Sequence, residues 1–161
     1  WLRDNVDAIK ALDYDALEYM IAGSCNIKRE VVEKDPTEKG DRALLNFGHT
    51  HGHAIEKLMN FNLYHGECVA LGMLAALKIS NARGLISDED IDDAVDMLKL
   101  YDFPMSVTGI EAPDVVAVSK SDKKMDAGKI KFVLIDSIGH AFLDTTVTDA
   151  EMLEALNGII E

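Results

Sequence analysis

The feature that most constrains the fold is how little interrupts the helical periodicity of this chain. Only three prolines and eleven glycines punctuate its 161 residues, and apolar residues recur at three- and four-residue steps, which is typical of amphipathic helices. The predicted helices cover residues 3–12, 14–34, 42–59, 66–83 and 87–100, with a short one near Pro113 and a last one after Thr148. The segments 129–135 and 140–145 flank a turn and predict a β-hairpin. The sequence therefore predicts a mainly α fold, a helical bundle domain with one small β-hairpin.

Local signals mark where two of these helices begin. Ser87 is followed three positions later by Asp90, and Thr148 by Glu151. Both pairs resemble capping boxes, in which each partner satisfies a backbone N–H of the other.

The long helix 14–34 is predicted to start at an Asp13 cap and to stop before Pro36. Lys28 is predicted to lie on its inward face. The other residues expected on that face are Leu17, Ile21, Ser24, Val31 and Val32.

Composition excludes several classes of partner. The formal net charge is −13. This charge argues against nucleic acid and anionic membranes as binding partners, because both bind clusters of Lys and Arg. Cys25 and Cys68 form no CxxC pair and fit a reducing cytoplasm. No apolar run is long enough to span a membrane. We expect a single cytoplasmic domain over residues 1–161, and the start at Trp1 suggests a fragment of a longer protein.

Four of the five histidines fall within seventeen positions, between His49 and His65. If residues 42–59 form one helix, a polar stripe shares one face and is costly to bury unless it binds something. That stripe consists of Arg42, Asn46, His49, His53 and Glu56. His49 and His53 have the spacing of two metal ligands on successive turns, with His65 or Glu56 as a third. The alternative is that some of these histidines are structural and bonded to carbonyls.

Glycines and cations accompany this segment. Gly48 and Gly52 each cost about 1 kcal/mol of helix propensity relative to Ala, which indicates either a ligand approaching the backbone or tight helix packing. Arg42, Lys28 and the pair at 123–124 supply positive charge that suits carboxylate or phosphate, although solvated surface charge is the ordinary role of lysine.

Taken together, these residues resemble the signature of the 3-dehydroquinate synthase family. The segment Arg42-Ala-Leu-Leu-Asn46-x-Gly-His49-Thr-x-Gly-His53-Ala-Ile-Glu56 carries most of the likeness. Further segments match in the same order: Asp35-x-x-Glu38-x-Gly-x-Arg42, His65-Gly66-Glu67, Asp122-Lys123-Lys124 and Lys131-Phe132-Val133-Leu134. The likeness covers essentially the whole chain.

The resemblance implies the C-terminal half of a two-domain enzyme whose N-terminal, Rossmann-like domain binds NAD. The intact enzyme would convert 3-deoxy-D-arabino-heptulosonate 7-phosphate to 3-dehydroquinate and phosphate, in the shikimate pathway of aromatic amino acid biosynthesis. Zinc or cobalt would serve as the metal, a phosphorylated sugar acid as the substrate, and a homodimer as the full-length assembly. The isolated domain is expected to be inactive.

The resemblance also assigns roles to individual residues. His49 and His65 correspond to metal ligands, and the family's third ligand is a glutamate upstream of this chain. His53 corresponds to a proton-transfer residue, in place of the ligand role that its spacing favours, and Glu38 to a second acid–base carboxylate. The residues that correspond to substrate contacts are Lys28, Arg42, Asn46, Lys123 and Lys124. His51 departs from the family pattern, where an apolar residue is common, and on a helical wheel it faces away from the predicted metal ligands.

Two other functions stay open. One is a related sugar-phosphate cyclase or a metal-dependent polyol dehydrogenase domain. The other is a non-catalytic helical binding domain in which the histidines are structural.

Overall fold

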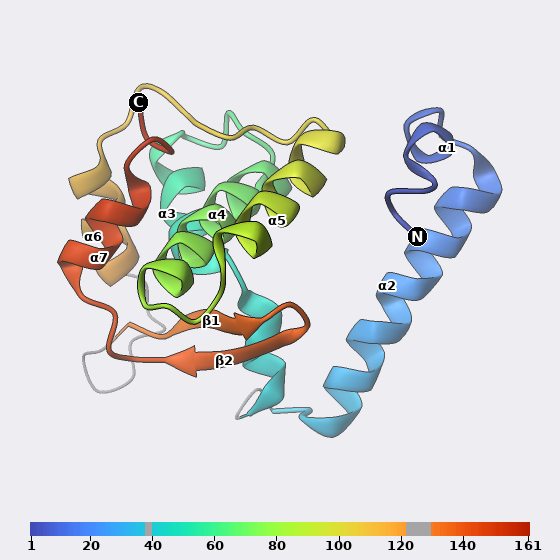
Figure 1. The fold of residues 1–161 in the computed structure, drawn as a ribbon, viewed down its shortest axis with the longest axis horizontal. Helices are drawn as coiled ribbons and strands as arrows, with labels where there is room; N and C mark the ends of the chain where they lie inside the picture. The colour runs from blue at the N-terminus through green and yellow to red at the C-terminus, as the bar shows by residue number, and fades with distance from the viewer. Residues whose placement is uncertain (38–39, 122–129) are drawn as a thin grey trace.

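The structure is a computed structural model that describes residues 1–37, 40–121 and 130–161. A central helix, α4 (His65–Ala82), is surrounded by other helices and by one small sheet (Figure 1). The surrounding helices are α3 (His49–Leu58), α5 (Asp88–Leu100), α6 (Ala112–Ser121) and α7 (Asp149–Leu156). The mainly helical fold with one hairpin is therefore confirmed.

Helix α4 occupies the centre because its sequence is apolar on nearly every side. Ten of its eighteen residues are buried, and Leu71 and Ile79 are 0% and 1% exposed. It packs against α3, α5, α7 and the first strand of the sheet. Burying a Leu or Ile side chain stabilises a fold by about 1.5–3 kcal/mol, so this helix anchors the hydrophobic core.

The hairpin closes one side of the bundle. Strands β1 (Phe132–Ser137) and β2 (His140–Asp144) pair antiparallel, from Phe132 opposite Asp144 to Ser137 opposite His140. Residues 132–135 are all buried, because β1 packs on α4 while also contacting the segment before α3. The expected start of this strand at residue 129 lies outside the described residues, and its end is two residues later than predicted.

The predicted capping boxes are present. Ser87 Oγ accepts from the backbone N–H of Asp90 at 3.2 Å, and the Asp90 carboxylate accepts from the N–H of Ser87 at 2.9 Å. Thr148 and Glu151 make the same exchange at the start of α7. These bonds satisfy donors that a helix start otherwise leaves open.

An ion-pair cluster links the end of α4 to α7 and β2. Arg83 Nε lies 2.7 Å from Glu151 Oε1, and Arg83 Nη1 lies 3.1 Å from Asp144 Oδ2. The hydrogen bond from Arg83 lowers the pKa of Glu151 to about 2. The cluster fixes the helix α7 beside the end of the central helix.

The prediction of one helix over 42–59 is wrong. Residues Asp41–Asn46 form a 3-10 helix, η1, and α3 starts only at His49. Between them Phe47 leaves the helical conformation, with a ψ of 127°, and Gly48 has a φ of +78°, a left-handed conformation that favours glycine. Arg42 and Asn46 therefore do not share a helical face with the histidines.

The predicted inward face of the long helix is also wrong. Helix α2 (Tyr14–Lys34) follows the short α1 (Val6–Lys10) and stands apart from the bundle (Figure 1). Only Ala16 is buried on it, whereas Ile21 is 57% exposed and Lys28 is exposed. The helix contacts α1 and η1, and four of its large apolar side chains are more than half exposed: Tyr14, Tyr19, Ile21 and Ile27.

Among the described residues, every helix is too short or too polar to cross a lipid bilayer.

Candidate metal centre

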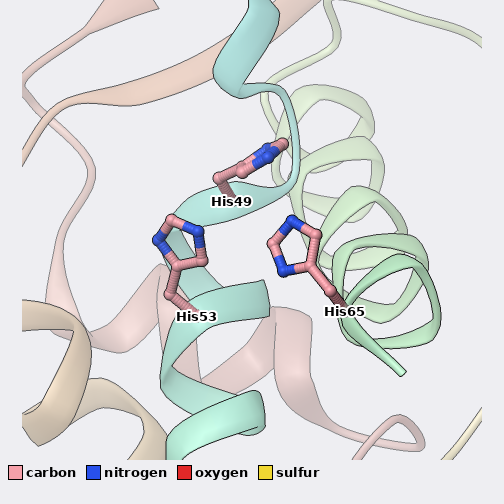
Figure 2. Close-up of side chains that lie close together, drawn as sticks. All are labelled: His49, His53 and His65. Atoms are coloured by element: carbon pink, nitrogen blue, oxygen red, sulfur yellow. The ribbon is translucent and has the colours of Figure 1, made fainter. Parts of the chain in front are cut away.

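Three histidines from two helices converge at one place. The rings of His49, His53 and His65 face a common space between α3 and α4 (Figure 2). Each offers a ring nitrogen, and these nitrogens all lie within 4.8 Å of one another. The ring centroids are 5.1, 5.4 and 5.6 Å apart for the pairs 49–53, 49–65 and 53–65. Three imidazole nitrogens at this separation form a donor set that suits zinc or cobalt.

The helix starts place these side chains. His49 is the first residue of α3, His53 lies one turn further along the same helix, and His65 is the first residue of α4. The two histidines of α3 therefore share a face, as their spacing predicted. His65 completes the group because the N-terminus of α4 lies beside them.

Glycines allow the close approach of α3 and α4. A Cβ on Gly72 would lie 1.9 Å from the carbonyl oxygen of Gly48 and 2.7 Å from the nitrogen of Gly52. A Cβ on Gly48 would lie 2.6 Å from Val69 O, and one on Gly52 would lie 3.0 Å from Val69 Cα. Of the two explanations for Gly48 and Gly52, tight helix packing is the one that the structure shows.

Hydrogen bonds indicate which ring nitrogen carries the hydrogen in two of these histidines. His49 Nδ1 lies 3.1 Å from the carbonyl oxygen of Phe47, and His65 Nδ1 lies 3.2 Å from Glu56 Oε1. A carbonyl or an ionised carboxylate only accepts, so each Nδ1 carries the hydrogen. The lone pair of each ring is then on Nε2, which is the state a metal ligand requires.

His51 lies on the opposite side of α3, in the core. It is 1% exposed, its Nδ1 is 3.0 Å from Ser119 Oγ, and its ring packs edge-on to Phe132. Burial lowers the pKa of His51 from 6.5 to about 4, so the ring is neutral at neutral pH. The expectation that His51 faces away from the other histidines is confirmed.

A pocket of about 370 Å³ opens beside His53, between α3 and α6. Its polar lining includes Thr50, Lys57, Ser119 and Ser121. Lys57 was not among the residues predicted for the site, although its position four residues after His53 puts both on one helical face. The pocket gives His53 a space that a small molecule can enter.

Comparison with known proteins decides the family. The family model described as 3-dehydroquinate synthase C-terminal matches residues 1–125. The chain belongs to this family. The 3-dehydroquinate synthase of Shewanella halifaxensis is 42% identical over 161 residues, which are 98% of this chain and 44% of that protein. The enzyme of Shewanella piezotolerans is 40% identical over 159 residues, with the same coverage of each chain. The chain thus spans less than half the length of these relatives.

Solved structures share the fold of this chain. The 2-epi-5-epi-valiolone synthase of Streptomyces hygroscopicus, with NAD+ and Zn2+ bound, superposes with a TM-score of 0.86 at 21% identity, over 98% of this chain and 44% of that one. A 2-deoxy-scyllo-inosose synthase complexed with carbaglucose-6-phosphate, NAD+ and Co2+ superposes with a TM-score of 0.76 at 26% identity, over 88% and 41%. Each of these proteins is about twice as long as this chain.

Of the residues that the 3-dehydroquinate synthase signature relates to substrate, those within the described part of the chain lie on η1 and α2. The Arg42 side chain donates to the carbonyl oxygen of Pro36 at 2.9 Å, and Asn46 Nδ2 donates to that of Ala43 at 3.1 Å. Lys28 is exposed on α2, the helix that contacts η1. Glu38, Lys123 and Lys124 lie outside the described residues, so their predicted roles stay predictions.

Proposed function

We propose that this chain is the metal- and substrate-binding half of a 3-dehydroquinate synthase. The intact enzyme would convert 3-deoxy-D-arabino-heptulosonate 7-phosphate to 3-dehydroquinate and phosphate in the cytoplasm, as a step of the shikimate pathway. The convergence of His49, His53 and His65 carries the proposal, since it gives the family signature a chemical centre. The match to the family over residues 1–125 and the 40–42% identity to enzymes of that name support it.

In this proposal His49 and His65 hold the metal through Nε2. A bound zinc or cobalt ion would act as a Lewis acid that polarises the oxygen at the carbon being oxidised. The two solved relatives hold Zn2+ and Co2+, ions that imidazole nitrogens bind well.

His53 is proposed to move a proton rather than to bind the metal. It lies one turn beyond His49, and it alone of the three histidines lines the pocket between α3 and α6. A substrate in that pocket would meet the ring at hydrogen-bonding distance, as general acid–base catalysis requires. Glu38 is proposed as a second acid–base group.

The substrate's carboxylate and phosphate are proposed to bind Lys28, Arg42, Lys123 and Lys124, and its hydroxyls to bind Asn46. A chain with a net charge of −13 has no general affinity for anions, so such binding requires a local group of cations. Helix α2 and η1 are in contact, which puts Lys28 and Arg42 on neighbouring elements.

NAD is proposed to bind mainly to an upstream domain. The relatives are long enough to contain such a domain in addition to the part that this chain matches. The sequence has neither GxGxxG nor GxxxxGK[ST], the loops that commonly cradle phosphates. Both solved relatives have NAD+ bound, and each is about twice as long as this chain. The full-length protein is proposed to be a homodimer.

A second candidate function is a related sugar-phosphate cyclase. The 2-deoxy-scyllo-inosose synthase, complexed with carbaglucose-6-phosphate, has the same fold at 26% identity. The two candidates differ in the substrate, because only the heptulosonate carries a carboxylate for Arg42 to bind in bidentate fashion.

The proposal is tested in a chimaera that joins the upstream half of the Shewanella halifaxensis enzyme to Trp1 of this chain. Phosphate release is measured with NAD and zinc, from the heptulosonate phosphate and from glucose 6-phosphate. We expect release from the first only. Release from glucose 6-phosphate alone would favour the second candidate, and release from neither would contradict both.

The same chimaera separates the roles of the histidines. We expect His53→Ala to retain the metal while kcat falls by about 10²–10⁴-fold, the usual contribution of a general acid or base. His49→Ala should lose the metal. The reverse result, with metal lost in His53→Ala and kept in His49→Ala, would exchange the two assignments.

A further inference from the structure

Glu56 makes a contact across the two helices that the proposed reaction does not use. It lies on α3, one turn after His53, and its Oε1 is 3.2 Å from Nδ1 of His65 on α4. The Glu56 side chain is 19% exposed, whereas the His65 side chain is 52% exposed. The more buried side chain, Glu56, therefore restrains the more exposed ring of His65.

The position of this contact on the ring decides its effect. The carboxylate accepts the hydrogen of Nδ1, so the lone pair is on Nε2. A carboxylate in this position also fixes the plane of the ring and makes Nε2 a stronger donor. Without it, the exposed ring of His65 could rotate and exchange its hydrogen between the two nitrogens.

Glu56 is not itself placed as a ligand, although its spacing in the sequence allowed that role. The group of mutually close donor atoms consists of the nitrogens of His49, His53 and His65. Glu56 Oε1 instead contacts Nδ1 of His65. The nitrogen of His65 that would bind the metal is the other one, Nε2.

We propose that Glu56 is a positioning residue that orients His65 and fixes its tautomer for metal binding. The proposal deepens the proposed function and rests on it for the identity of the ligand that His65 binds. The orientation of His65 can be measured in the metal-free chain, so the two proposals can fail separately.

Glu67 provides a matched control. Burial, followed by the negative charges of Glu56 and Glu67, raises the pKa of Cys68 to about 11, so both carboxylates act on the same region. The Glu67 carboxylate accepts from the backbone N–H of Tyr64 at 2.8 Å rather than from His65. Glutamine can replace glutamate in this helix-capping role, so Glu67→Gln removes a nearby charge while leaving His65 untouched.

The first test is nitrogen NMR of the His65 ring in the metal-free 161-residue chain, at a pH where the ring is neutral. We expect the Nδ1–H tautomer in the wild type, in Glu56→Gln, whose amide oxygen still accepts, and in Glu67→Gln. In Glu56→Ala the signal should shift towards the Nε2–H tautomer. An unchanged tautomer in Glu56→Ala would overturn the proposal.

The second test is zinc affinity of the same variants. We expect Glu56→Ala to bind about 10–100-fold more weakly, the usual loss when such a partner is removed, and Glu56→Gln to lose less. Glu67→Gln should stay within about twofold of the wild type. Equal losses in Glu56→Gln and Glu67→Gln would show a general charge effect and contradict a positioning role. If the wild type binds no zinc, the proposed metal function fails, and the tautomer measurement still decides the role of Glu56.

Discussion

Histidines that are neighbours in the sequence have opposite environments in the fold. His49 and His53 face the cluster, while His51, between them, is buried against Ser119 and Phe132. The helical period predicted this division, because residues two apart point to opposite sides. It could not predict Ser119 as the partner, since that residue is 68 positions away.

The burial of His51 predicts a pH-dependent stability. Its pKa is lowered from 6.5 to about 4. Between these pH values His51 is protonated in the unfolded chain and neutral in the folded chain. The contribution of neutral His51 is complete above pH 6.5 and is lost as the pH falls from about 6.5 to about 4. The total loss is about 3 kcal/mol.

His51→Leu should remove this component, because leucine fills a similar volume and binds no proton. Urea unfolding at pH 7.5 and pH 4.5 measures the free energy of unfolding of both proteins, and other groups titrate equally in each. We expect the wild type to lose about 2–3 kcal/mol more than the variant between these pH values. Equal losses would show that His51 is not held neutral.

At the scale of elements, the sequence predicted helix starts better than it predicted breaks. The pairs Ser87–Asp90 and Thr148–Glu151 form the expected caps because their bonds are local. The break at Phe47–Gly48 was missed because the polar period continues across it. Only the packing of Gly48 against α4 shows why the chain must turn there.

The glycine contact between α3 and α4 predicts a large effect of one methyl group. Gly72→Ala would put a Cβ 1.9 Å from the carbonyl oxygen of Gly48, so the helices must separate. We expect the free energy of unfolding to fall by about 1–3 kcal/mol or more, together with weaker zinc binding as His65 moves from His49. Thermal or urea unfolding and calorimetry measure the two effects.

Gly23→Ala on α2 is the matched control, since nothing lies within 4 Å of a Cβ there. Alanine favours a helix over glycine, so this variant should gain about 0.5–1 kcal/mol. A Gly72→Ala protein as stable as Gly23→Ala would contradict the close contact.

At the scale of the whole molecule, the placement of α2 is what the sequence could not give. Its apolar spacing predicted an inward face. Periodicity identifies an apolar face of a helix, but it does not identify the surface against which that face packs. His49, His53 and His65, which the sequence had singled out, lie close together, and the roles that the family resemblance gives them stay predictions. The contact of Glu56 with His65 required the three-dimensional structure.

The exposure of α2 predicts that its isoleucines contribute little to stability. Ile21 is 57% exposed and Ile79, in the core, is 1% exposed. We expect Ile21→Ala to change the free energy of unfolding by less than about 0.5 kcal/mol, and Ile79→Ala to lower it by about 2–5 kcal/mol. Equal costs in urea unfolding would place α2 against the core.

The 161-residue chain alone should show no turnover of the heptulosonate phosphate with NAD and zinc supplied. It spans 44% of the length of its relatives and contains no dinucleotide-binding fingerprint. Phosphate release is the readout, and the active chimaera is its positive control. Release above background from the chain alone would show that it binds NAD itself.

Zinc calorimetry on the 161-residue chain tests whether His49 and His65 form a metal centre between α3 and α4. Two protein ligands fall short of the three of most catalytic zinc sites, so we predict one weak site in the wild type. Binding should be lost in His49→Ala and in His65→Ala but kept in His51→Leu. Absence of binding in the wild type, or unchanged affinity in His49→Ala with loss in His51→Leu, would exclude a metal centre at His49 and His65.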